Sequence, residues 1–199
     1  VENYTIFMIV ALMPWNFFTT AVQQGCGCIV ANEGILKKVY FPREILPVSI
    51  VTSTLVNFLI TCIIMFVFII FGGVGVTWHV LLFPLIILIQ YIITLALVFI
   101  LSAIVVFVRD VDHFVGIVLM LAFYVTPIIY TPDMLPAKFQ WAITFNPIAQ
   151  LINAYRDILY YHQLPNMTSL GIVGLVSLAA LGLGYMIFKK LERNFVEEL

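Results

Sequence analysis

Charge is scarce in this sequence. It contains nine Lys or Arg and ten Asp or Glu residues among 199 positions, so 10% of the chain is charged while 63% is hydrophobic. Soluble domains carry about 25% charged and about 45–50% apolar residues. A soluble chain of this length could not bury so much apolar surface, and the composition therefore predicts a protein whose solvent is lipid. The net charge of −1 gives no reason to expect nucleic acid as a partner.

The sequence also lacks the short motifs that carry most enzyme chemistry. It has no GxxxxGK[ST] nucleotide-binding loop, no HExxH and no GxSxG. Its three cysteines, Cys26, Cys28 and Cys62, have a spacing that favours structural roles over a zinc site or a disulfide framework. No ionisable residue lies well inside an apolar run, although proton relays and ion-coupled transporters depend on such residues. These absences argue against ATP binding by this chain and against ion-coupled transport.

Long apolar segments predict an all-α polytopic membrane protein with a single transmembrane domain over residues 1–199. A spanning helix needs about 20 mostly apolar residues, and these segments lack the alternation of membrane barrel strands. The five expected spans are 4–22, 46–71, 80–108, 114–130 and 170–188.

Basic residues decide the expected orientation. Seven Lys or Arg residues lie in the linkers after the first and third spans and in the C-terminal tail, whereas the other connections hold only Lys138 and Arg156. The positive-inside rule places the first group in the cytoplasm. The first span then begins outside, and the simplest explanation is one further N-terminal helix, missing here, that gives six spans in the full protein.

The cytoplasmic linker 23–45 contains the most concentrated polar segment of the chain, which we call the island (Glu33 to Glu44). Lys37, Lys38 and Arg43 supply its positive charge, and apolar residues are interspersed among them. A compact, charged and partly amphipathic loop between two spans predicts a contact surface for another protein.

The external connection 131–168 is the longest and least hydrophobic. Asn146 followed by Pro147 is a helix start, with an N-cap and then proline at the first helical position. It predicts an amphipathic helix over 147–161, preceded by a shorter helix over 136–145. Two such helices at the outer surface indicate a re-entrant helical hairpin or an interfacial lid.

Small residues recur at steps of three and four in the last span, at Gly171, Gly174, Ser177, Ala180 and Gly184. This pattern predicts close packing against a neighbouring helix.

The sequence Asp110-Val111-Asp112-His113 is the one tight cluster of possible metal ligands. A DxD motif beside a membrane can hold a divalent cation and a nucleotide-sugar diphosphate, as in glycosyltransferases. The favoured alternative is a helix boundary, in which Asp112 caps the next helix and Arg109 anchors the interface, because the chain has no soluble catalytic domain to complete a site.

Several motifs, taken in order, resemble the membrane subunit of type-2 ABC exporters. Residues 35–47 are similar to the cytoplasmic loop of that family, and Phe107 to Val111 to the RD element before its fifth helix. Thr126 to Tyr130, Leu135-Pro136 and Phe145-Asn146-Pro147 resemble its outer gate region, and residues 188–192 also fit. The similarity covers essentially the whole chain, without the first helix of the family.

The resemblance implies the type-2 ABC exporter fold, a homodimer and two copies of a cytoplasmic ATPase subunit, which would bind ATP and Mg. This chain would then be no enzyme and would hold no cofactor, metal or catalytic residue. It would lie in the bacterial cytoplasmic membrane, in contact with lipid. The island would be the first coupling segment and the Arg109 loop the second. The residues expected at the ATPase are Glu33, Ile35, Leu36, Lys37, Lys38, Val39, Tyr40, Phe41, Arg43, Glu44, Arg109 and Asp110.

The closest branch of the resemblance exports polyprenyl-diphosphate-linked cell-surface polymers. We expect wall teichoic acid, with O-antigen or capsule as alternatives. Aromatic residues near the external ends are expected to line the path or the outer gate of 131–168, since aromatic faces stack on sugar rings. They are Tyr124, Tyr130, Phe139, Trp141, Tyr155, Tyr160 and Tyr161. Other functions left open are a membrane-embedded glycosyl- or phosphotransferase using Asp110 and Asp112, ABC export of a drug or small lipid, and an ATP-independent channel or scaffold.

Overall fold

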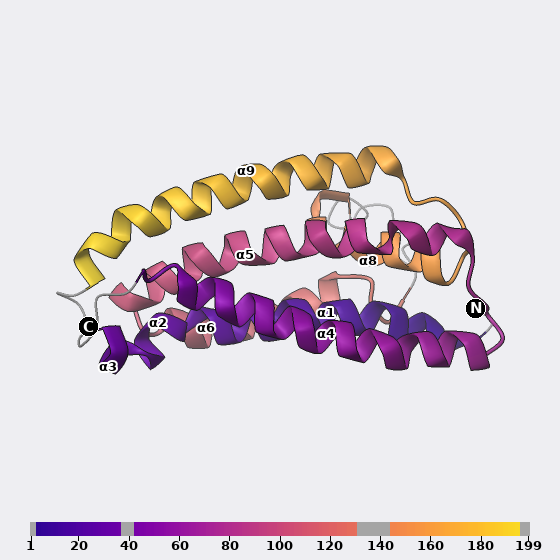
Figure 1. Ribbon diagram of the computed structural model, residues 1–199, viewed down its shortest axis with the longest axis horizontal. Helices are drawn as coiled ribbons and strands as arrows, with labels where there is room; N and C mark the ends of the chain where they lie inside the picture. The colour runs from indigo at the N-terminus through magenta and orange to yellow at the C-terminus, as the bar shows by residue number, and fades with distance from the viewer. Residues whose placement is uncertain (1–2, 37–41, 131–143, 196–199) are drawn as a thin grey trace.

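The structure, a computed structural model, describes residues 3–36, 42–130 and 144–195, and these form an elongated bundle of helices (Figure 1). The helices are, in chain order, α1 (Tyr4–Cys26), α2 (Cys28–Ala31), α3 (Glu33–Leu36), α4 (Ile45–Phe71), η1 (Trp78–Leu82), α5 (Phe83–Phe107), α6 (Val111–Val125), α8 (Pro147–Leu159), α9 (Met167–Leu191) and η4 (Glu192–Asn194).

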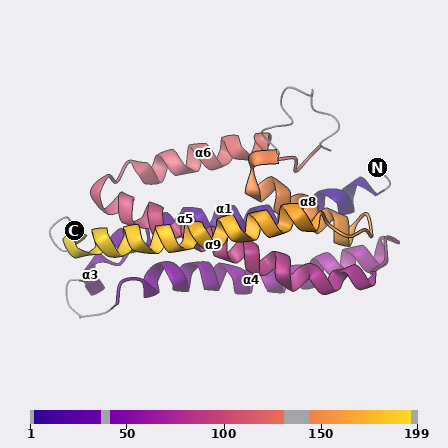
Figure 2. The ribbon, with the colours of Figure 1, turned by 90° about the horizontal axis from the view of Figure 1, so that it is seen from above.

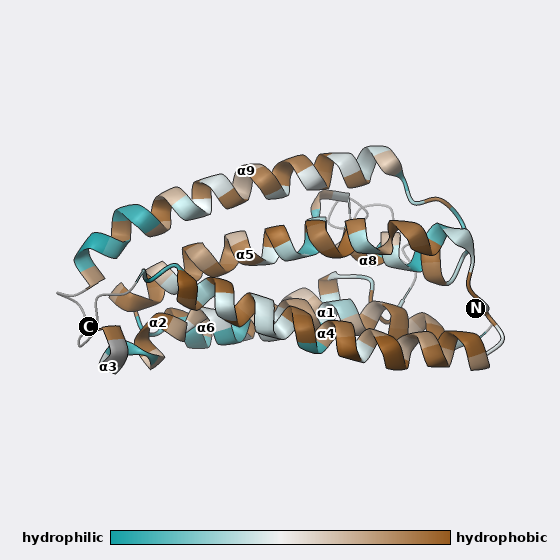
Figure 3. Ribbon diagram, viewed as in Figure 1, coloured by the Kyte–Doolittle hydropathy of each residue, from teal (hydrophilic) through white to brown (hydrophobic). Residues whose placement is uncertain are grey.

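Four helical stretches within the described ranges are long and apolar enough to cross a membrane: Tyr4–Cys26, Ile45–Phe71, Trp78–Phe107 and Met167–Asn194. They coincide with four of the expected spans, because in hydrocarbon only a helix satisfies every backbone polar group of a single segment. The predicted all-α membrane fold is therefore confirmed. Figure 3 shows mostly apolar residues along α5 and at the end of α4, and hydrophilic residues at the end of α9.

The fourth expected span, 114–130, is shorter than the apolar run that predicted it. Helix α6 has 15 residues and ends at Val125. The next residue, Thr126, is extended (φ −83°, ψ 132°), because a residue before proline is excluded from the helical region by the ring of Pro127. The helix also begins at Val111, three positions before the expected boundary.

Helix α5 occupies the centre of the bundle and packs against α1, α4, α8 and α9. Helix α9 covers it on one side, while α1 and α4 lie on the other (Figure 1). Seen from above, α1 lies between α4 and α6 (Figure 2). Helix α6 makes few contacts with the rest of the chain, and of its side chains only Val115 is buried.

A buried hydrogen-bond network joins three of these helices. The Tyr155 hydroxyl of α8 donates to Oε1 of Gln90 at 2.8 Å, and Nε2 of Gln90 donates to the backbone oxygen of Pro14 in α1 at 2.8 Å. Gln90 and Tyr155 are 1% and 0% exposed. Because an unsatisfied buried polar group costs about 1–3 kcal/mol, the network fixes α8 against the core of the bundle.

The predicted small-residue face of α9 packs against α5 where the two helices are closest. Ser177 is fully buried, and a Cβ atom added to Gly184 would lie 2.7 Å from the backbone oxygen of Ala96. A Cβ added to Gly174 would touch only Ile89 at 3.6 Å, whereas none of the described atoms lies within 4 Å of one at Gly171. Close packing is thus confirmed for the inner part of the face and not for its first residue.

This close approach gives a stability prediction. We expect Gly184→Ala to destabilise the protein by about 1–3 kcal/mol, because the new methyl group meets backbone and the helices must separate. Gly182→Ala is the matched control, since its Cβ meets no described atom within 4 Å and alanine is the better helix former. Thermal unfolding of the purified protein in detergent measures both, and equal midpoints for the two variants would contradict the packing.

Candidate functional site

The inner end of the bundle is the end that carries α3, the start of α4 and the end of α9 (Figure 1). Nζ of Lys189 lies 2.8 Å from Oε2 of Glu44 and 2.9 Å from Oε2 of Glu192. Arg43 donates to the backbone oxygen of Glu192 and lies over the ring of Phe195, 5.9 Å from its centroid. We call these five residues the inner clasp, because they attach the last residues of the island to the end of α9.

The clasp depends on pH. The hydrogen bond from Lys189 lowers the pKa of the Glu44 carboxyl below its ordinary value. The pair therefore contributes stability above the ordinary carboxyl pKa, and that contribution is lost as the pH falls through the lowered value. At neutral pH the carboxylate is ionised and the clasp is closed.

The rest of the expected ATPase-contact surface is only partly described. Lys37, Lys38, Val39, Tyr40 and Phe41 lie outside the described residues, as does the side chain of Ile35. Glu33 and Leu36 are half-buried in the short helix α3, while Arg109 and Asp110 are exposed in the turn between α5 and α6.

The expected cap of α6 was wrong. The N-cap residue is Asp110, whose side chain makes no capping hydrogen bond, and Asp112 lies in the first turn. The Asp112 carboxylate instead accepts a hydrogen bond from Nε2 of Gln23 at 3.4 Å. It therefore connects α6 to α1 rather than closing its own helix end.

The outer end of the bundle depends on Arg156. The guanidinium group donates to the backbone oxygens of Pro127 and Ile128, both at 2.6 Å, and lies 3.7 Å from the ring centroid of Phe7. The side chain is 2% exposed. Burial lowers its pKa to about 10, so it is charged at neutral pH. Arg156 thus satisfies two carbonyl groups that the end of α6 leaves outside helical hydrogen bonding.

The local sequence around Arg156 behaves as expected. The side-chain oxygen of Asn146 accepts from the backbone nitrogens of Ile148 and Ala149 at 3.0 and 3.3 Å, which confirms the predicted N-cap. The helix it starts, α8, ends at Leu159, two residues before the predicted boundary. The companion helix predicted over 136–145 lies almost entirely outside the described residues.

The expected path aromatics fall in different environments. Tyr124 and Tyr161 are exposed, and each lines a cavity. Tyr155 is buried within the subunit, and Tyr160 packs edge-on against Phe7 with ring centroids 5.6 Å apart. The Tyr130 hydroxyl donates to the backbone oxygens of Tyr124 and Val125 at 2.9 and 3.1 Å. Phe139 and Trp141 lie outside the described residues.

One face of α1 carries a line of uncharged polar side chains at helical spacing. We call Asn16, Thr19, Thr20, Gln23 and Gln24 the polar row. Asn16, Thr20 and Gln24 are exposed, although α1 is apolar enough to span a membrane. A row of amides and hydroxyls needs water or a polar partner at membrane depth, because hydrocarbon provides none.

Two hollows follow the polar row, one on each side. The first, about 500 Å³, lies between α1 and α6 and includes Gln23 and Tyr124 in its lining. The second, about 200 Å³, lies between α1 and α4, where Asn57 and Thr61 add to its polar lining. Thr20 and Gln24 line both, so the row forms the shared wall of a polar groove between α4 and α6.

A bundle of apolar helices with such a groove is typical of a membrane transport protein. Residues 1–160 match the family of ABC-2 type transporters, and the chain belongs to this family. Family membership and the four apolar helices make it a multi-pass integral protein of the bacterial inner membrane.

Curated relatives share the whole length of the chain. It is 36% identical over 201 residues to the O-antigen export system permease protein RfbA of Myxococcus xanthus, and 37% identical over 203 residues to a protein of the same name from Klebsiella pneumoniae. A second Klebsiella pneumoniae protein with that name is 35% identical over 203 residues. Each alignment covers 100% of this chain and 77% of the relative.

Sequence reasoning missed the polar row and the role of Arg156. The spacing of the row in steps of three and four is visible in the sequence, but amides and hydroxyls are common enough in helices that their spacing alone does not mark a site. The sequence identifies Arg156 only as an external charge, because its carbonyl partners become neighbours only when the chain folds.

Removing Arg156 should destabilise the outer end. We expect Arg156→Met to lower the free energy of unfolding by about 2–4 kcal/mol, because two buried carbonyl groups lose charge-assisted hydrogen bonds. Arg193→Met is the matched control, since Arg193 is exposed. Thermal unfolding in detergent distinguishes them, and an unchanged midpoint for Arg156→Met would show that water replaces the guanidinium without loss.

Proposed function

We propose that this chain is the membrane-spanning subunit of an ATP-driven exporter that moves a lipid-linked polysaccharide of the O-antigen type across the cytoplasmic membrane. The similarity to three O-antigen export permeases over the full length of the chain supports the substrate class. None of these relatives is named for teichoic acid, so the initial preference for wall teichoic acid gives way to O-antigen.

The observation that carries the proposal is the polar groove, formed by the polar row of α1 and by Asn57 and Thr61 of α4. Asn16, Gln24 and Asn57 make no side-chain hydrogen bond among the described residues, yet they lie on helices that otherwise face lipid or core. Leaving such groups unsatisfied away from water costs roughly 1–3 kcal/mol each. Sugar hydroxyls both donate and accept hydrogen bonds, and a glycan passing along the groove would satisfy these amides in turn.

A second copy of this chain would complete the path. The groove is open on the side away from the subunit core, and the neighbouring helix α6 exposes Phe114, Ile117, Met120 and Leu121. Such a face needs lipid or protein to cover it. Two copies that pack their α6 helices together would enclose both polar rows between them, while the polyprenyl part of the substrate stays in lipid.

Energy would come from two copies of a separate ATPase subunit that binds ATP and Mg. The described parts of the island, residues 33–36 and 42–44, lie at the inner end with the Arg109 turn, where such a partner would dock. The inner clasp attaches the island to α9, which packs against α5 along its length. A displacement of the island would therefore reach α9 and the centre of the bundle directly.

No observation favours the alternatives. Asp112 is engaged by Gln23, and the described residues contain no group of three or more His, Cys, Asp or Glu side chains placed to hold a metal ion. A transferase using Asp110 and Asp112 therefore gains no support, and export of a drug or small lipid gains none from the named relatives.

The polar groove is tested by replacing one amide on each of its walls, Asn16 on α1 and Asn57 on α4. We expect Asn16→Leu together with Asn57→Leu to lower the amount of polysaccharide at the cell surface at least several-fold, because the groove can no longer hydrogen-bond a glycan. Immunoblotting of surface polymer measures it, with Ser53→Leu as the control, since Ser53 is exposed on α4 and lines neither hollow. A wild-type amount of surface polymer in the double variant would show that these amides do not contact the exported glycan. Wild-type surface polymer after deletion of the whole gene would refute the proposed function.

The inner clasp is tested by exchanging its charges. We expect Glu44→Lys and Lys189→Glu each to reduce the polymer exported per ATP hydrolysed, because like charges then face each other at the island, and the double exchange to restore it. Stability should change little, since a partly exposed ion pair near the surface contributes only about 0–1 kcal/mol. Transport and ATP hydrolysis by the reconstituted complex give the readout. A double variant as defective as the single ones would show that the pair does not act as a unit.

A further inference from the structure

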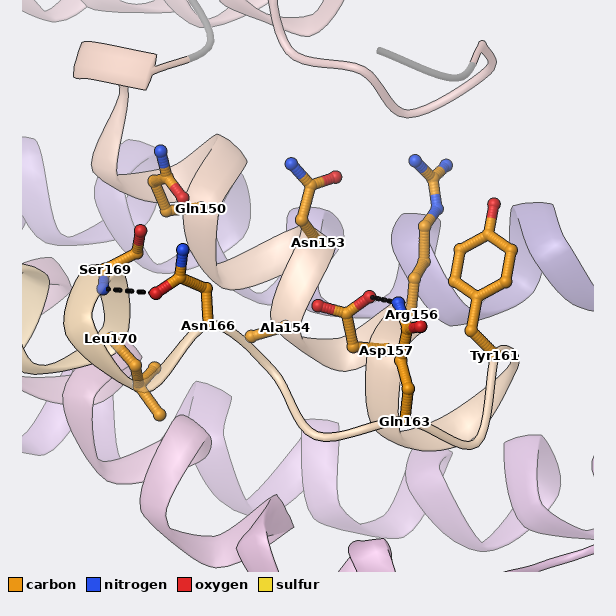
Figure 4. Close-up of a pocket in the computed structure, with 10 residues that line it drawn as sticks. All are labelled: Gln150, Asn153, Ala154, Arg156, Asp157, Tyr161, Gln163, Asn166, Ser169 and Leu170. Atoms are coloured by element: carbon orange, nitrogen blue, oxygen red, sulfur yellow. Dashed lines mark hydrogen bonds between the residues drawn. The ribbon is translucent and has the colours of Figure 1, made fainter. Parts of the chain in front are cut away.

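A separate polar cavity of about 540 Å³ lies at the outer end, away from the polar row (Figure 4). Its lining comes from α8, the loop that follows it and the first turn of α9. The residues are Gln150, Asn153, Ala154, Arg156, Asp157, Tyr161, Gln163, Asn166, Ser169 and Leu170. Its volume lies within the roughly 300–1,000 Å³ typical of small-ligand pockets.

Helix α8 presents its polar face to this cavity. Gln150, Asn153 and Asp157 follow each other at steps of three and four, whereas the opposite face, with Leu151 and Ile158, is fully buried in the bundle. The loop after α8 is held in place, because Nε2 of His162 lies 2.8 Å from the backbone oxygen of Val74 in the turn between α4 and α5. The cavity is therefore built on fixed elements.

The lining has hydrogen-bonding capacity that the protein does not use. Asn153 makes no side-chain hydrogen bond among the described residues, and its amide points into the open space in Figure 4. Asn166 uses its oxygen to cap α9, which leaves its amide nitrogen available. Asp157 accepts from Nε2 of Gln163 through one oxygen at 2.7 Å. Donors and acceptors thus line the same cavity, as a ring bearing several hydroxyl groups requires.

Burial supplies a second and independent observation. Arg156, on the wall of this cavity, is 2% exposed, and its Nε atom has no hydrogen-bond partner among the described residues. Burial also raises the pKa of Asp157, so its carboxylate is incompletely solvated and gains from further donors. One buried cation and one carboxylate leave the wall nearly neutral, which favours a neutral, hydroxyl-rich ligand over a strong anion or cation.

We propose that this outer cavity binds one sugar residue of the exported polymer as the polymer leaves the membrane. The amides of Asn153 and Asn166 and the Asp157 carboxylate hydrogen-bond the hydroxyl groups of the sugar. The exposed ring of Tyr161 packs against the apolar face of the sugar ring. This inference rests on the proposed function. It gives the outer end of the subunit a holding site that is distinct from the polar row and that retains the glycan between transport steps.

The test uses the complex of this chain with its ATPase, reconstituted in nanodiscs. The probe is the free oligosaccharide repeat released from the surface polymer of the source bacterium, and its binding is measured by saturation-transfer NMR titration. We expect Asn153→Ala and the isosteric Asp157→Asn each to weaken binding about tenfold, the effect of one lost hydrogen bond to a charged or amide group. Asn194→Ala, an exposed amide at the inner end, should bind as wild type does.

Two outcomes overturn the inference and leave the proposed function standing. One is a wild-type complex that exports polymer in cells but binds no repeat at its outer face, and the other is equal affinity for wild type, Asn153→Ala and Asp157→Asn. Because Asp157→Asn preserves shape and size, failure of Asn153→Ala to fold would not decide the question. A different result would refute the proposed function itself, namely surface polymer that persists when the gene is deleted.

Discussion

Hydrocarbon offers no hydrogen bonds, and this constraint determines most of what the structure contains. Where the backbone leaves α6 at the outer end, side chains satisfy its carbonyl groups. Arg156 binds the carbonyl oxygens of Pro127 and Ile128, the Tyr4 hydroxyl binds that of Ile129, and Tyr130 binds two at the end of α6. The buried guanidinium is tolerated there only because it donates hydrogen bonds to two carbonyl groups that would otherwise be unsatisfied. The outer end is therefore held together by side chains from α1 and α8 that serve the backbone of another segment.

The same constraint makes the polar row significant. In an aqueous protein, five amides and hydroxyls on one helix face would need no explanation, whereas here they form the wall of a groove without partners for several of them. The inner clasp, the polar row and the outer cavity lie in that order along the bundle. They are three separate polar features, with no lining residue shared between the outer cavity and the groove, in a chain that is otherwise apolar.

The long helices could be predicted because a run of apolar residues allows only one structure in lipid, and Asn146-Pro147 marked the start of α8 because capping is local. What escaped prediction depends on residues far apart in the chain. The partners of Arg156 lie 28 and 29 residues away, and those of Glu44 and Gln90 lie on other helices. The cap assigned to Asp112 failed because α6 begins at Val111, which places Asp112 inside the first turn, where its side chain meets Gln23 of a distant helix. The spacing of small residues predicted that one face of α9 packs closely against another helix. It could not predict that the partner of Gly184 is Ala96 of α5.

The brevity of α6 has a consequence for the bilayer itself. A helix of 15 residues is about 22 Å long, at about 1.5 Å per residue, whereas the hydrocarbon layer is about 30 Å thick. Lipids beside α6 must compress or bend to cover it. Such thinning would occur on the flank where the hollow between α1 and α6 opens, and a substrate there would cross a shorter stretch of hydrocarbon.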